Sequence, residues 1–422
     1  MRALYKILVI ILLTILVFST NQSQAQNQNI GRYYVTIRGP VGNAVRGAGG
    51  QIIHEYNTVS AITIQIPNAA LQGLARNPNV ISIQPDALAW AFAKPDKPPG
   101  QDKKPPNNDP PEEPTQELPW GVDRIDAEYA SSTGNNVNVA VIDTGIERNH
   151  EDLSVAGGIN LCTYSPLTYP FPVIPDPEAW DDDRGHGTHV AGTIAAKDNN
   201  LGVIGVAPNA SLYAVKVLAY DGSGWFSDIL AGIEWCIYND IDIINMSLGG
   251  TLSGPELDDL RDICQLAYNQ GILIVASAGN SGNAGNPVLY PAAIDEYVIA
   301  VAAMGYTKRG KKYIEYIPNW STYGDQVDIT APGVNIYSTY IGNQYTTMSG
   351  TSMAAPHVTG TLALIKEAKG SIFAEIIDGY LDVPDLYNTA DDLLTNGWDQ
   401  YTGWGLVDAE EATTGSEEEG ND

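Results

Sequence analysis

Cysteine and basic residues are scarce in this chain of 422 residues. Three cysteines (Cys162, Cys236 and Cys264) allow at most one disulfide, so the fold cannot depend on a disulfide framework. Lys and Arg number 22 against 50 Asp and Glu, and from Thr115 onward the counts are 12 and 43. Such an acidic surface repels nucleic acids and anionic membranes and favours solubility. Salt tolerance is one interpretation of this charge, and an ordinary solvated acidic face is the simpler one.

Long apolar runs are also lacking, except at the start of the chain. Arg2 and Lys6 lead into an apolar run at residues 7–18, and small residues reach Ala25. This order is typical of a secretory signal over residues 1–25, and it predicts a secreted, extracellular protein. An uncleaved membrane anchor is the alternative, because the run approaches the lower limit for a span. No later stretch is apolar enough to span, so we expect no stable membrane association after cleavage.

The length exceeds one ordinary domain, and the apolar pattern divides the chain. Within residues 26–93 it predicts strands at 33–37, 62–66 and 80–83 and helices at 41–49 and 69–76, a small α+β domain in βαββαβ order. A small ligand-binding domain of this topology is an alternative interpretation. Residues 94–114 are rich in Pro, Asp and Lys without apolar periodicity, and they predict an extended linker.

Residues 115–412 alternate apolar runs with helical patterns. Continuous apolar runs at 137–142, 211–217, 241–246, 272–276 and 298–302 are typical of buried parallel strands. Helical spacing occurs at 189–196, 226–238 and 256–270, and Cys236 and Cys264 fall in these patterns as small core residues. The alternation predicts one three-layer α/β domain with a mostly parallel sheet covered on both faces. Residues 413–422 are an acidic tail.

Three segments carry residues of an acyl-transfer triad. Asp143 ends an apolar run, His186 opens the sequence HGTHVAG, and Ser352 lies at the start of a helical pattern, where free N–H groups favour a developing anion. Asp, His and Ser in this order form one of the three known arrangements of the triad. Catalytic groups of such a sheet gather at the carboxyl ends of its strands, where Asp143 and Asn280 are expected.

Each of these residues also has an ordinary interpretation. A serine at a helix start is usually a cap. His186 and His189 are three residues apart on a helix face and could pair on a metal, but a zinc site needs a third ligand and the sequence has no HExxH. Asp-Thr-Gly at 143–145 also occurs in aspartic proteases, which carry a second such triplet that is missing here.

Four motifs together resemble the subtilisin-like serine proteases: DTGI at 143–146, GHGTHVAG at 185–192, SAGN at 277–280 and GTSMA at 350–354. The resemblance implies that Ser352 is the nucleophile, His186 the general base and Asp143 the residue that orients the imidazole. It further implies that the Asn280 amide and the Ser352 N–H stabilise the tetrahedral oxygen, and that His189 is a packed neighbour. The resemblance therefore predicts a serine endopeptidase acting on polypeptides, and we expect a monomer.

The resemblance also predicts how substrate is held. Two edges would grip an extended peptide by its backbone, which implies broad specificity, and a pocket would receive the residue before the cut. The residues concerned are Gly222, Ser223, Gly224, Ser247, Leu248, Gly249, Ser277, Gly279 and Leu289. Family members often carry a small residue at the position of Leu289, so this pocket is expected to be shallow.

A structural calcium ion is implied as well. The segment KDNNLGV at 197–203 resembles the family's calcium loop, and hard oxygen donors suit this ion. The ligands would be the side chains of Gln116, Asp152 and Asn199 and the carbonyls of Lys197, Leu201 and Val203.

Residues 26–93 resemble the inhibitory propeptide of the same proteases, so the chain's own propeptide is a predicted partner. Alignment on its last strand predicts self-cleavage after Phe92, although an aromatic residue fits poorly with a shallow pocket. A cut nearer Thr115 is the alternative.

A maturation protease with few substrates and an inactive peptide-binding homologue are the competing functions. The acidic run of Asp181, Asp182 and Asp183 also suggests a processing protease that cuts at basic residues. The motifs HGTHVAG and GTSMA, which match degradative proteases better, and the nearby Arg184 oppose this function. Insertions at 161–180 and 372–395 have no predicted role.

Overall fold

The computed structural model describes residues 30–95, 116–163, 175–285, 287–309 and 312–414. The predicted signal, most of the linker, part of the 161–180 insertion and most of the acidic tail lie outside these residues. The described chain forms two compact units that divide between Asp86 and Ala87.

The first unit is a four-stranded antiparallel sheet in the order β2-β3-β1-β4. Its core contains Val35, Val45, Ile62, Ile64 and Leu74. The predicted 69–76 helix is a 3₁₀ turn followed by a four-residue helix. The fourth strand, β2, was implied only by the βαββαβ order, because its residues are mostly half-buried and show no clear alternation. The elements are β1 (Ile30–Ile37), α2 (Gly42–Gly47), β2 (Gln51–Glu55), β3 (Ala61–Pro67), η1 (Asn68–Ala70), α3 (Leu71–Leu74) and β4 (Val80–Pro85).

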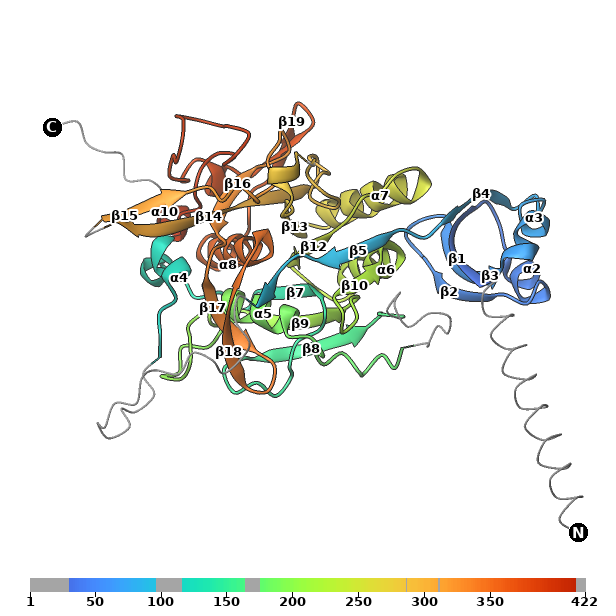
Figure 1. Ribbon diagram of the computed structural model, residues 1–422, viewed down its shortest axis with the longest axis horizontal. Helices are drawn as coiled ribbons and strands as arrows, with labels where there is room; N and C mark the ends of the chain where they lie inside the picture. Colours follow the sequence, from blue (N-terminus) through green and yellow to red (C-terminus); the bar gives the residue numbers. More distant parts are fainter. Residues whose placement is uncertain (1–29, 96–115, 164–174, 286, 310–311, 415–422) are drawn as a thin grey trace, which may run out of the picture. The chain divides into compact units, whose positions relative to one another are not determined.

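The second unit is built on a sheet in the order β15-β14-β13-β11-β7-β9-β8, with β16 beside β14 (Figure 1). All its pairs are parallel except β14 with β15, so the predicted mostly parallel sheet is confirmed. The strands are β7 (Asn138–Asp143), β8 (Val155–Asn160), β9 (Ser211–Lys216), β11 (Ile243–Met246), β13 (Leu273–Ser277), β14 (Val298–Arg309), β15 (Lys312–Tyr316) and β16 (Ile329–Pro332).

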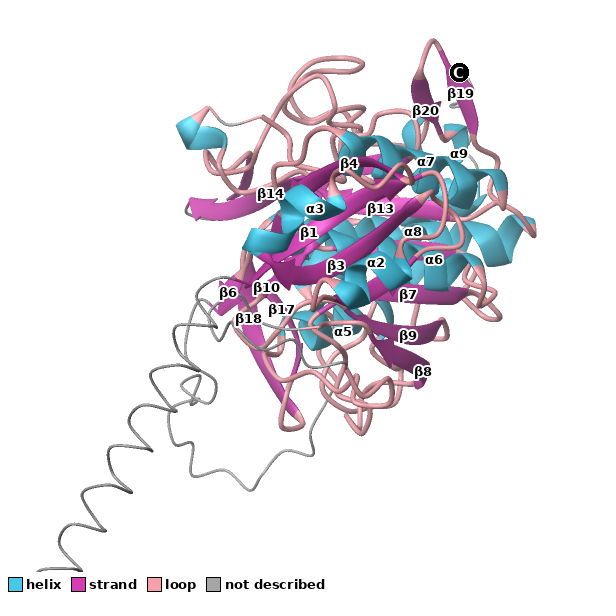
Figure 2. Ribbon diagram, turned by 90° about the vertical axis from the view of Figure 1, so that its right-hand side faces the viewer, coloured by secondary structure: helices cyan, strands magenta, loops and turns pink. Residues whose placement is uncertain are grey.

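Two pairs of helices cover this sheet, α5 with α8 and α6 with α7 (Figure 2). Val139 and Val141 of β7 share a core cluster with residues of α5 and α8. Val215 of β9 instead faces α6, where a Cβ on Gly232 would lie 3.1 Å from it. The sheet is therefore buried on both faces, which gives the predicted three layers. The helices are α5 (His186–Ala195), α6 (Phe226–Ile237), α7 (Pro255–Asn269) and α8 (Thr351–Lys369).

Shorter elements complete the second unit. Among them, the 372–395 insertion forms the hairpin β19–β20 and the helix α9. The elements are β5 (Leu88–Ala91), β6 (Lys94–Pro95), α4 (Trp120–Arg124), η2 (Ala127–Tyr129), β10 (Ser223–Trp225), β12 (Leu248–Gly249), η3 (Gly282–Ala284), β17 (Ile336–Tyr340), β18 (Gln344–Ser349), β19 (Glu375–Ile377), β20 (Tyr380–Asp382), α9 (Pro384–Tyr387) and α10 (Ala409–Thr414).

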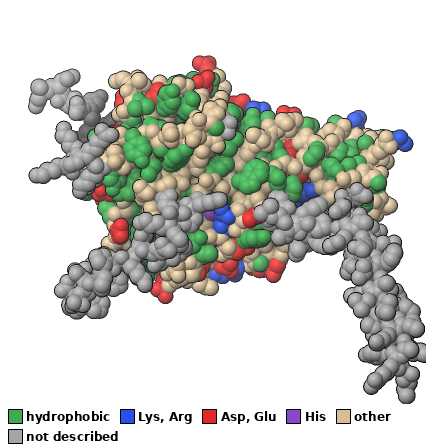
Figure 3. All heavy atoms as spheres, viewed as in Figure 1, with side chains coloured by type: hydrophobic (Ala, Val, Ile, Leu, Met, Phe, Trp, Pro, Cys, Tyr) green, Lys and Arg blue, Asp and Glu red, His purple; other side chains and the backbone are tan. Residues whose placement is uncertain are grey.

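The three cysteines form no disulfide within the described residues. Cys236 and Cys264 are buried in α6 and α7, as predicted, and burial raises the pKa of both thiols. Acidic side chains are scattered over the face seen in Figure 3. None of the helices among the described residues is long and apolar enough to cross a membrane.

Candidate active site

The carboxyl edge of the parallel sheet carries Asp143 and His186 in direct contact. Asp143 is the last residue of β7, and His186 is the first residue of α5. The imidazole Nδ1 lies 2.8 and 2.9 Å from the two carboxylate oxygens, and both side chains are buried. Thr144 N–H also donates to Asp143 Oδ1 at 2.7 Å. Since Nδ1–H donates to the Asp143 carboxylate, Nε2 is left as the basic atom, and it has no hydrogen-bond partner among the described residues.

Asp182 fixes the approach of these two elements. Its Oδ1 accepts from Thr144 Oγ1 at 2.8 Å and from Gly185 N at 2.9 Å, and its Oδ2 accepts from Thr188 N and Oγ1 at 2.9 and 2.7 Å. One carboxylate thus joins the end of β7 to the first turn of α5. Sequence reasoning treated this residue only as part of an acidic run. The local signal that was missed is an aspartate three residues before the glycine that precedes a helix.

The other acidic residues of this run also have partners within the chain. Asp181 pairs with Arg148, with Nε to Oδ2 at 2.6 Å, and Asp183 pairs with Lys216 Nζ at 2.8 Å. Lys216 also donates to the carbonyl of Thr144. Since its three carboxylates are engaged, the run gives no support to recognition of basic substrates.

Ser352 is the second residue of α8, which begins at Thr351. Its Oγ donates to the carbonyl of Ser247 at 3.0 Å rather than to His186. In return, Ser247 Oγ donates to the Ser352 carbonyl at 2.8 Å and accepts from Asn245 Nδ2 at 3.0 Å. Nucleophilic use of Ser352 therefore requires its hydroxyl to turn from Ser247 toward the imidazole. Such rearrangement is ordinary, because catalytic hydrogen bonds often tighten only in the substrate complex.

Asn280 lies three residues beyond the end of β13, with its amide fixed from behind. Its Oδ1 accepts from Thr351 N and Oγ1, both at 2.9 Å, and Thr351 Oγ1 accepts from Gly279 N at 3.1 Å. This turns Nδ2 toward the Phe92 carbonyl oxygen, to which it donates at 3.1 Å. The Ser352 N–H, the predicted second donor, makes no hydrogen bond to this carbonyl within the described part of the chain. Thr351 is a positioning residue that the sequence did not single out.

Strand β5 lies between two other strands, β10 and β12, as Figure 1 shows. In this sheet Trp90 pairs with Ser223 on one side and with Gly249 on the other, and both pairings are antiparallel. Ala91 N–H donates to Gly222 O at 2.8 Å. The predicted gripping segments 222–224 and 248–249 therefore both hold an extended chain, which here is the chain's own residues 88–91. Ser247, predicted with them, contacts Ser352 instead.

The same chain continues beside the start of α8, where a Cβ on Gly350 would lie 3.2 Å from Ala93 Cβ and 3.7 Å from Ser352 N. Phe92 presents its carbonyl to Asn280, and two residues later β6 pairs with β18, with Lys94 opposite Ser349. The side chains of His186, Ser352 and Ala93 are all almost fully buried. The Phe92–Ala93 peptide bond consequently lies at the catalytic edge.

The Phe92 ring approaches Gly249, where an added Cβ would lie 3.0 Å from its Cζ. Leu289 lies against Gly279, with Cδ1 3.3 Å from the position of a Cβ there. Ser277 is buried, and its hydroxyl has no partner among the described residues. An aromatic side chain is thus accommodated beside Gly249 although Leu289 is present. The shallow pocket stays a prediction.

Metal binding by the two histidines of α5 is opposed by their contacts. His189 Nε2 donates to the carbonyls of Ile336 and Thr346 at 3.0 and 3.2 Å, while His186 Nδ1 is held by Asp143. Burial, followed by the nearby charge of His186, lowers the pKa of His189 to about 3. His189 is a neutral packing residue. Within the described residues no cluster of three or more His, Cys, Asp or Glu suits a metal ion.

The residues predicted for calcium do come together. Gln116 Nε2 donates to the carbonyls of Lys197 and Val203, so an amide dipole points its positive end between two oxygens. Asp152 Oδ1 accepts from Asn199 Nδ2 at 3.1 Å beside them. The donor set is all oxygen and includes one carboxylate, which fits a hard cation. The oxygens of Gln116 and Asn199 now accept from backbone N–H groups, so both amides would have to turn to bind one.

The fold and this edge of the sheet define a class of protein, and comparisons with known proteins agree. Residues 134–405 match the family described as "Subtilase family". The chain is 43% identical over 302 residues to subtilisin DY of Bacillus licheniformis, covering 70% of this chain and 99% of that protein. It is 41% identical over 318 residues to the thermostable alkaline protease of Halalkalibacterium halodurans, covering 75% and 74%. The alkaline protease of Alkalihalobacillus alcalophilus is 38% identical over 366 residues, covering 86% and 82%.

This chain therefore belongs to the subtilase family, and it is a subtilisin-like serine protease.

Proposed function

We propose that the chain is a secreted endopeptidase of broad specificity, made as a zymogen that cuts itself between Phe92 and Ala93. The observation that carries this proposal is the hydrogen bond from Asn280 Nδ2 to the Phe92 carbonyl oxygen, beside Ser352 and at the end of a gripped strand. A carbonyl polarised in this way is the electrophile that the nucleophile of a serine protease attacks.

The proposed mechanism follows from these positions. Ser352 Oγ attacks the Phe92 carbonyl carbon while His186 Nε2 takes its proton, and Asp143 stabilises the resulting imidazolium. The negative oxygen is held by Asn280, whose amide cannot turn away because Thr351 holds its Oδ1. The imidazolium then gives its proton to the Ala93 nitrogen, and the peptide bond breaks to leave an acyl-enzyme on Ser352. Water activated by His186 hydrolyses this ester and frees the Phe92 carboxylate.

The zymogen arrangement assigns a role to each part of the chain. Residues 1–25 would be the signal that directs export, and 26–93 the inhibitory propeptide. Residues 94–114 would be a linker, 115–412 the catalytic domain and 413–422 an acidic tail. Since β5 already occupies the gripping edges, inhibition would persist until this strand leaves.

Backbone pairing supports broad specificity for polypeptides. Main-chain hydrogen bonds to segments 222–224 and 248–249 do not depend on side-chain identity. The space beside Gly249 favours a large residue before the cut, as Phe92 is. Ala89 is fully buried, so we expect a small residue three positions further upstream.

We further propose a structural calcium ion, which would be held by Gln116, Asp152 and Asn199 and by the carbonyls of Lys197, Leu201 and Val203. When bound, the ion would neutralise the buried Asp152 carboxylate and tie the segment before α4 to the loop after α5. A chelator should then lower the unfolding temperature of the purified protease, and added calcium should restore it. An unfolding temperature that ignores both would contradict this site.

One experiment tests the main proposal. The wild-type chain and its Ser352→Ala variant are expressed for secretion, and the products are examined by N-terminal sequencing and mass spectrometry. Wild type should yield a chain that begins at Ala93 and labels with a fluorophosphonate on Ser352, whereas the variant should stay joined and unlabelled. A start near Thr115 would move the cut, and processing of the variant as in wild type would refute self-cleavage.

Digestion of unfolded casein separates this function from its alternative. Many cuts are expected from a broad endopeptidase, whereas a maturation protease with few substrates would leave casein almost intact.

A further inference from the structure

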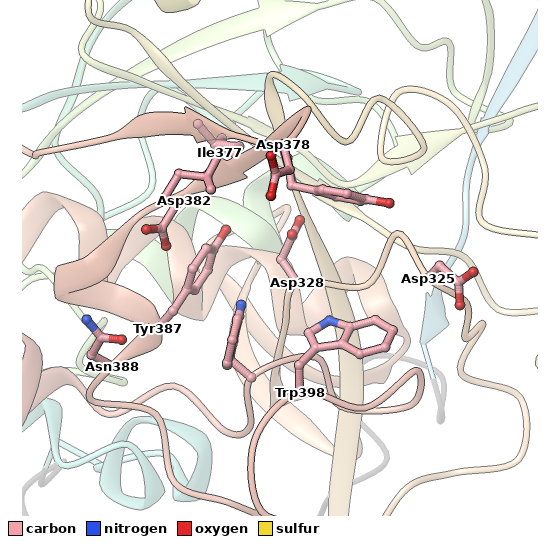
Figure 4. Close-up of a pocket in the computed structure, with 11 residues that line it drawn as sticks. Asp325, Asp328, Ile377, Asp378, Asp382, Tyr387, Asn388 and Trp398 are labelled. Carbon is pink, nitrogen blue, oxygen red and sulfur yellow. The ribbon is translucent and has the colours of Figure 1, made fainter.

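A cavity of about 780 Å³, separate from the active-site edge, lies beneath the β19–β20 hairpin of the 372–395 insertion. We call it the hairpin pocket and define it by Asp328, Asp378, Asp382, Tyr387, Trp398 and Trp404, which line it with other residues. None of these residues belongs to the active site described above. Figure 4 shows the carboxylate of Asp328 and the phenol of Tyr387 pointing toward the hairpin, with the Trp398 indole below them.

The described lining of this pocket has acidic side chains and no basic one. It contains four aspartates, Asp325 together with the three named above. Asp328 accepts from Ala300 N at 2.7 Å, and burial raises the pKa of its carboxyl well above the usual range, which favours the neutral form, so the negative charge is assigned to the other aspartates. No ion pair to any of the four occurs within the described parts of the chain. Asp183 and Asp242, by contrast, pair with Lys216 and Lys366. A group of unpaired carboxylates around a hollow attracts a positive charge.

Tyr387 supplies an independent sign of a missing partner. The residue is only 4% exposed, and its hydroxyl has no hydrogen-bond partner among the described residues. In Figure 4 this hydroxyl lies between the carboxylates of Asp328 and Asp382. Burial, followed by the charges of Asp328 and Asp382, raises its pKa, so it stays a neutral phenol. A buried hydroxyl without a partner costs free energy, and a bound group can remove that cost.

The remaining walls are aromatic. Trp398 and Trp404 are 40% and 43% exposed. Trp398 is held in place because its Nε1 donates to Val327 O at 3.0 Å, and Trp404 stacks on Tyr387 with ring centroids 6.5 Å apart. Fixed aromatic faces beside carboxylates suit cations that carry carbon or a flat π-system rather than bare metal ions. The volume agrees, since it exceeds what a single inorganic ion requires.

We propose that the hairpin pocket binds an organic cation, a guanidinium or alkylated ammonium group, between the indoles of Trp398 and Trp404 and the carboxylates of Asp378 and Asp382. Such a group is carried by free small molecules and by basic side chains of polypeptides. The chemistry of recognition is the same for both sources.

The pocket is connected to the active-site edge through one loop. Thr322 N–H donates to Gly279 O at 2.9 Å and Thr322 Oγ1 accepts from Ser281 N at 3.1 Å, on either side of Asn280. Only two residues separate Thr322 from Asp325 of the pocket. A basic side chain of a bound polypeptide is therefore included as a source to be tested.

The test is isothermal titration calorimetry on the mature protease after its active-site serine has been blocked by a fluorophosphonate. The probes are agmatine and choline for free cations, and end-blocked Gly-Arg-Gly for a polypeptide side chain. The neutral controls are 3,3-dimethylbutanol and the citrulline form of the peptide. We expect saturable binding of at least one cationic probe, with a dissociation constant on the order of 1 mM, and none of the neutral ones. The probe that binds more tightly identifies the source.

Matched variants locate the binding site. The double variant Asp378→Asn, Asp382→Asn keeps the shape of the pocket, and it should weaken binding about tenfold or more. Asp262→Asn, a substitution of an exposed aspartate on α7, should leave binding unchanged. Thermal unfolding of both variants checks that each is folded.

Three results would overturn the proposal. The first is the absence of saturable binding by all cationic probes, and the second is equal binding of charged and neutral probes. The third is full displacement of the bound probe by potassium or calcium chloride under conditions in which a bulky salt at the same ionic strength displaces less of it. None of these outcomes affects the proposed protease function, whose test is cleavage at Phe92.

Discussion

The active-site edge and the hairpin pocket both gather buried polar groups, but they treat those groups differently. At the active-site edge nearly every polar atom has a partner: Asp182 alone accepts from Thr144, Gly185 and Thr188. In the hairpin pocket the Tyr387 hydroxyl is buried without a partner, and the carboxylates have no counter-ion in the described chain. The polar groups of the active-site edge are therefore positioned before substrate binds, whereas those of the hairpin pocket still lack partners.

This difference separates two ways of building a site. Acyl transfer needs groups held in place before substrate arrives, because reorganisation during the reaction would add to the barrier. His186 Nε2, which must accept a proton, remains open at this edge among the described residues, as does the Ser277 hydroxyl. A pocket that only binds a ligand does not need this degree of order, because the ligand itself can complete the hydrogen bonds.

The comparison is tested most strongly at Asn280. Replacing Asn280 by Ala removes the donor to the Phe92 carbonyl, and we expect kcat to fall roughly 10²- to 10³-fold with KM little changed. That magnitude comes from subtilisin, a member of the same family. Kinetics on a peptide anilide measure it, and thermal unfolding checks the fold.

Asn283→Ala, in an exposed turn of η3, is the matched control and should retain full activity. If Asn280→Ala kept the wild-type kcat, the Asn280 amide would have no part in transition-state stabilisation.

A second, smaller effect is expected at Asp182. In Asp182→Asn one oxygen remains as an acceptor, and an NH₂ group replaces the other oxygen. This NH₂ group then faces N–H and O–H donors, either those of Thr144 and Gly185 or those of Thr188. The imidazole should lose its alignment, and kcat should fall about 10- to 100-fold while KM changes little. A loss of stability with unchanged kcat would show instead that Asp182 only holds the fold.

Asp181→Asn provides the comparison for this charge change. Asp181 is half-exposed and pairs with Arg148 at the surface, so its loss should alter kcat less than about twofold.

The sequence predicted those parts of the site that depend on local pattern. Apolar runs placed five parallel strands, and Asp143 and Asn280 follow two of them at the same edge of the sheet. The strands β8 and β16 were missed. β8 contains Gly157 and Gly158, and β16 contains Thr330 and Pro332, so neither forms a clear apolar run.

What sequence reasoning could not supply was the set of long-range contacts. Asp182 and Thr351 act through partners that lie close in space. Asp182 belongs to none of the four motifs, and Thr351 belongs to GTSMA, which does not identify its contact with Asn280. The hairpin pocket joins residues 325–328 to the insertion at 372–395 and to Trp404, which no local pattern links. The rotamer of Ser352, bonded to Ser247 instead of His186, is likewise a property of packing.

The smallest effect is predicted at Tyr387, and it is the most direct test of the comparison. Tyr387→Phe removes a hydroxyl that has no described partner, so the free energy of unfolding should stay the same or rise by up to about 1 kcal/mol. Tyr345→Phe removes a hydroxyl that donates to Asp152 Oδ2 at 3.2 Å, and it should lower that free energy by about 1 kcal/mol. Urea unfolding of the inhibited protease measures both. Equal losses from the two variants would mean that Tyr387 is as well bonded as Tyr345, and the distinction between a completed site and an incomplete one would fail.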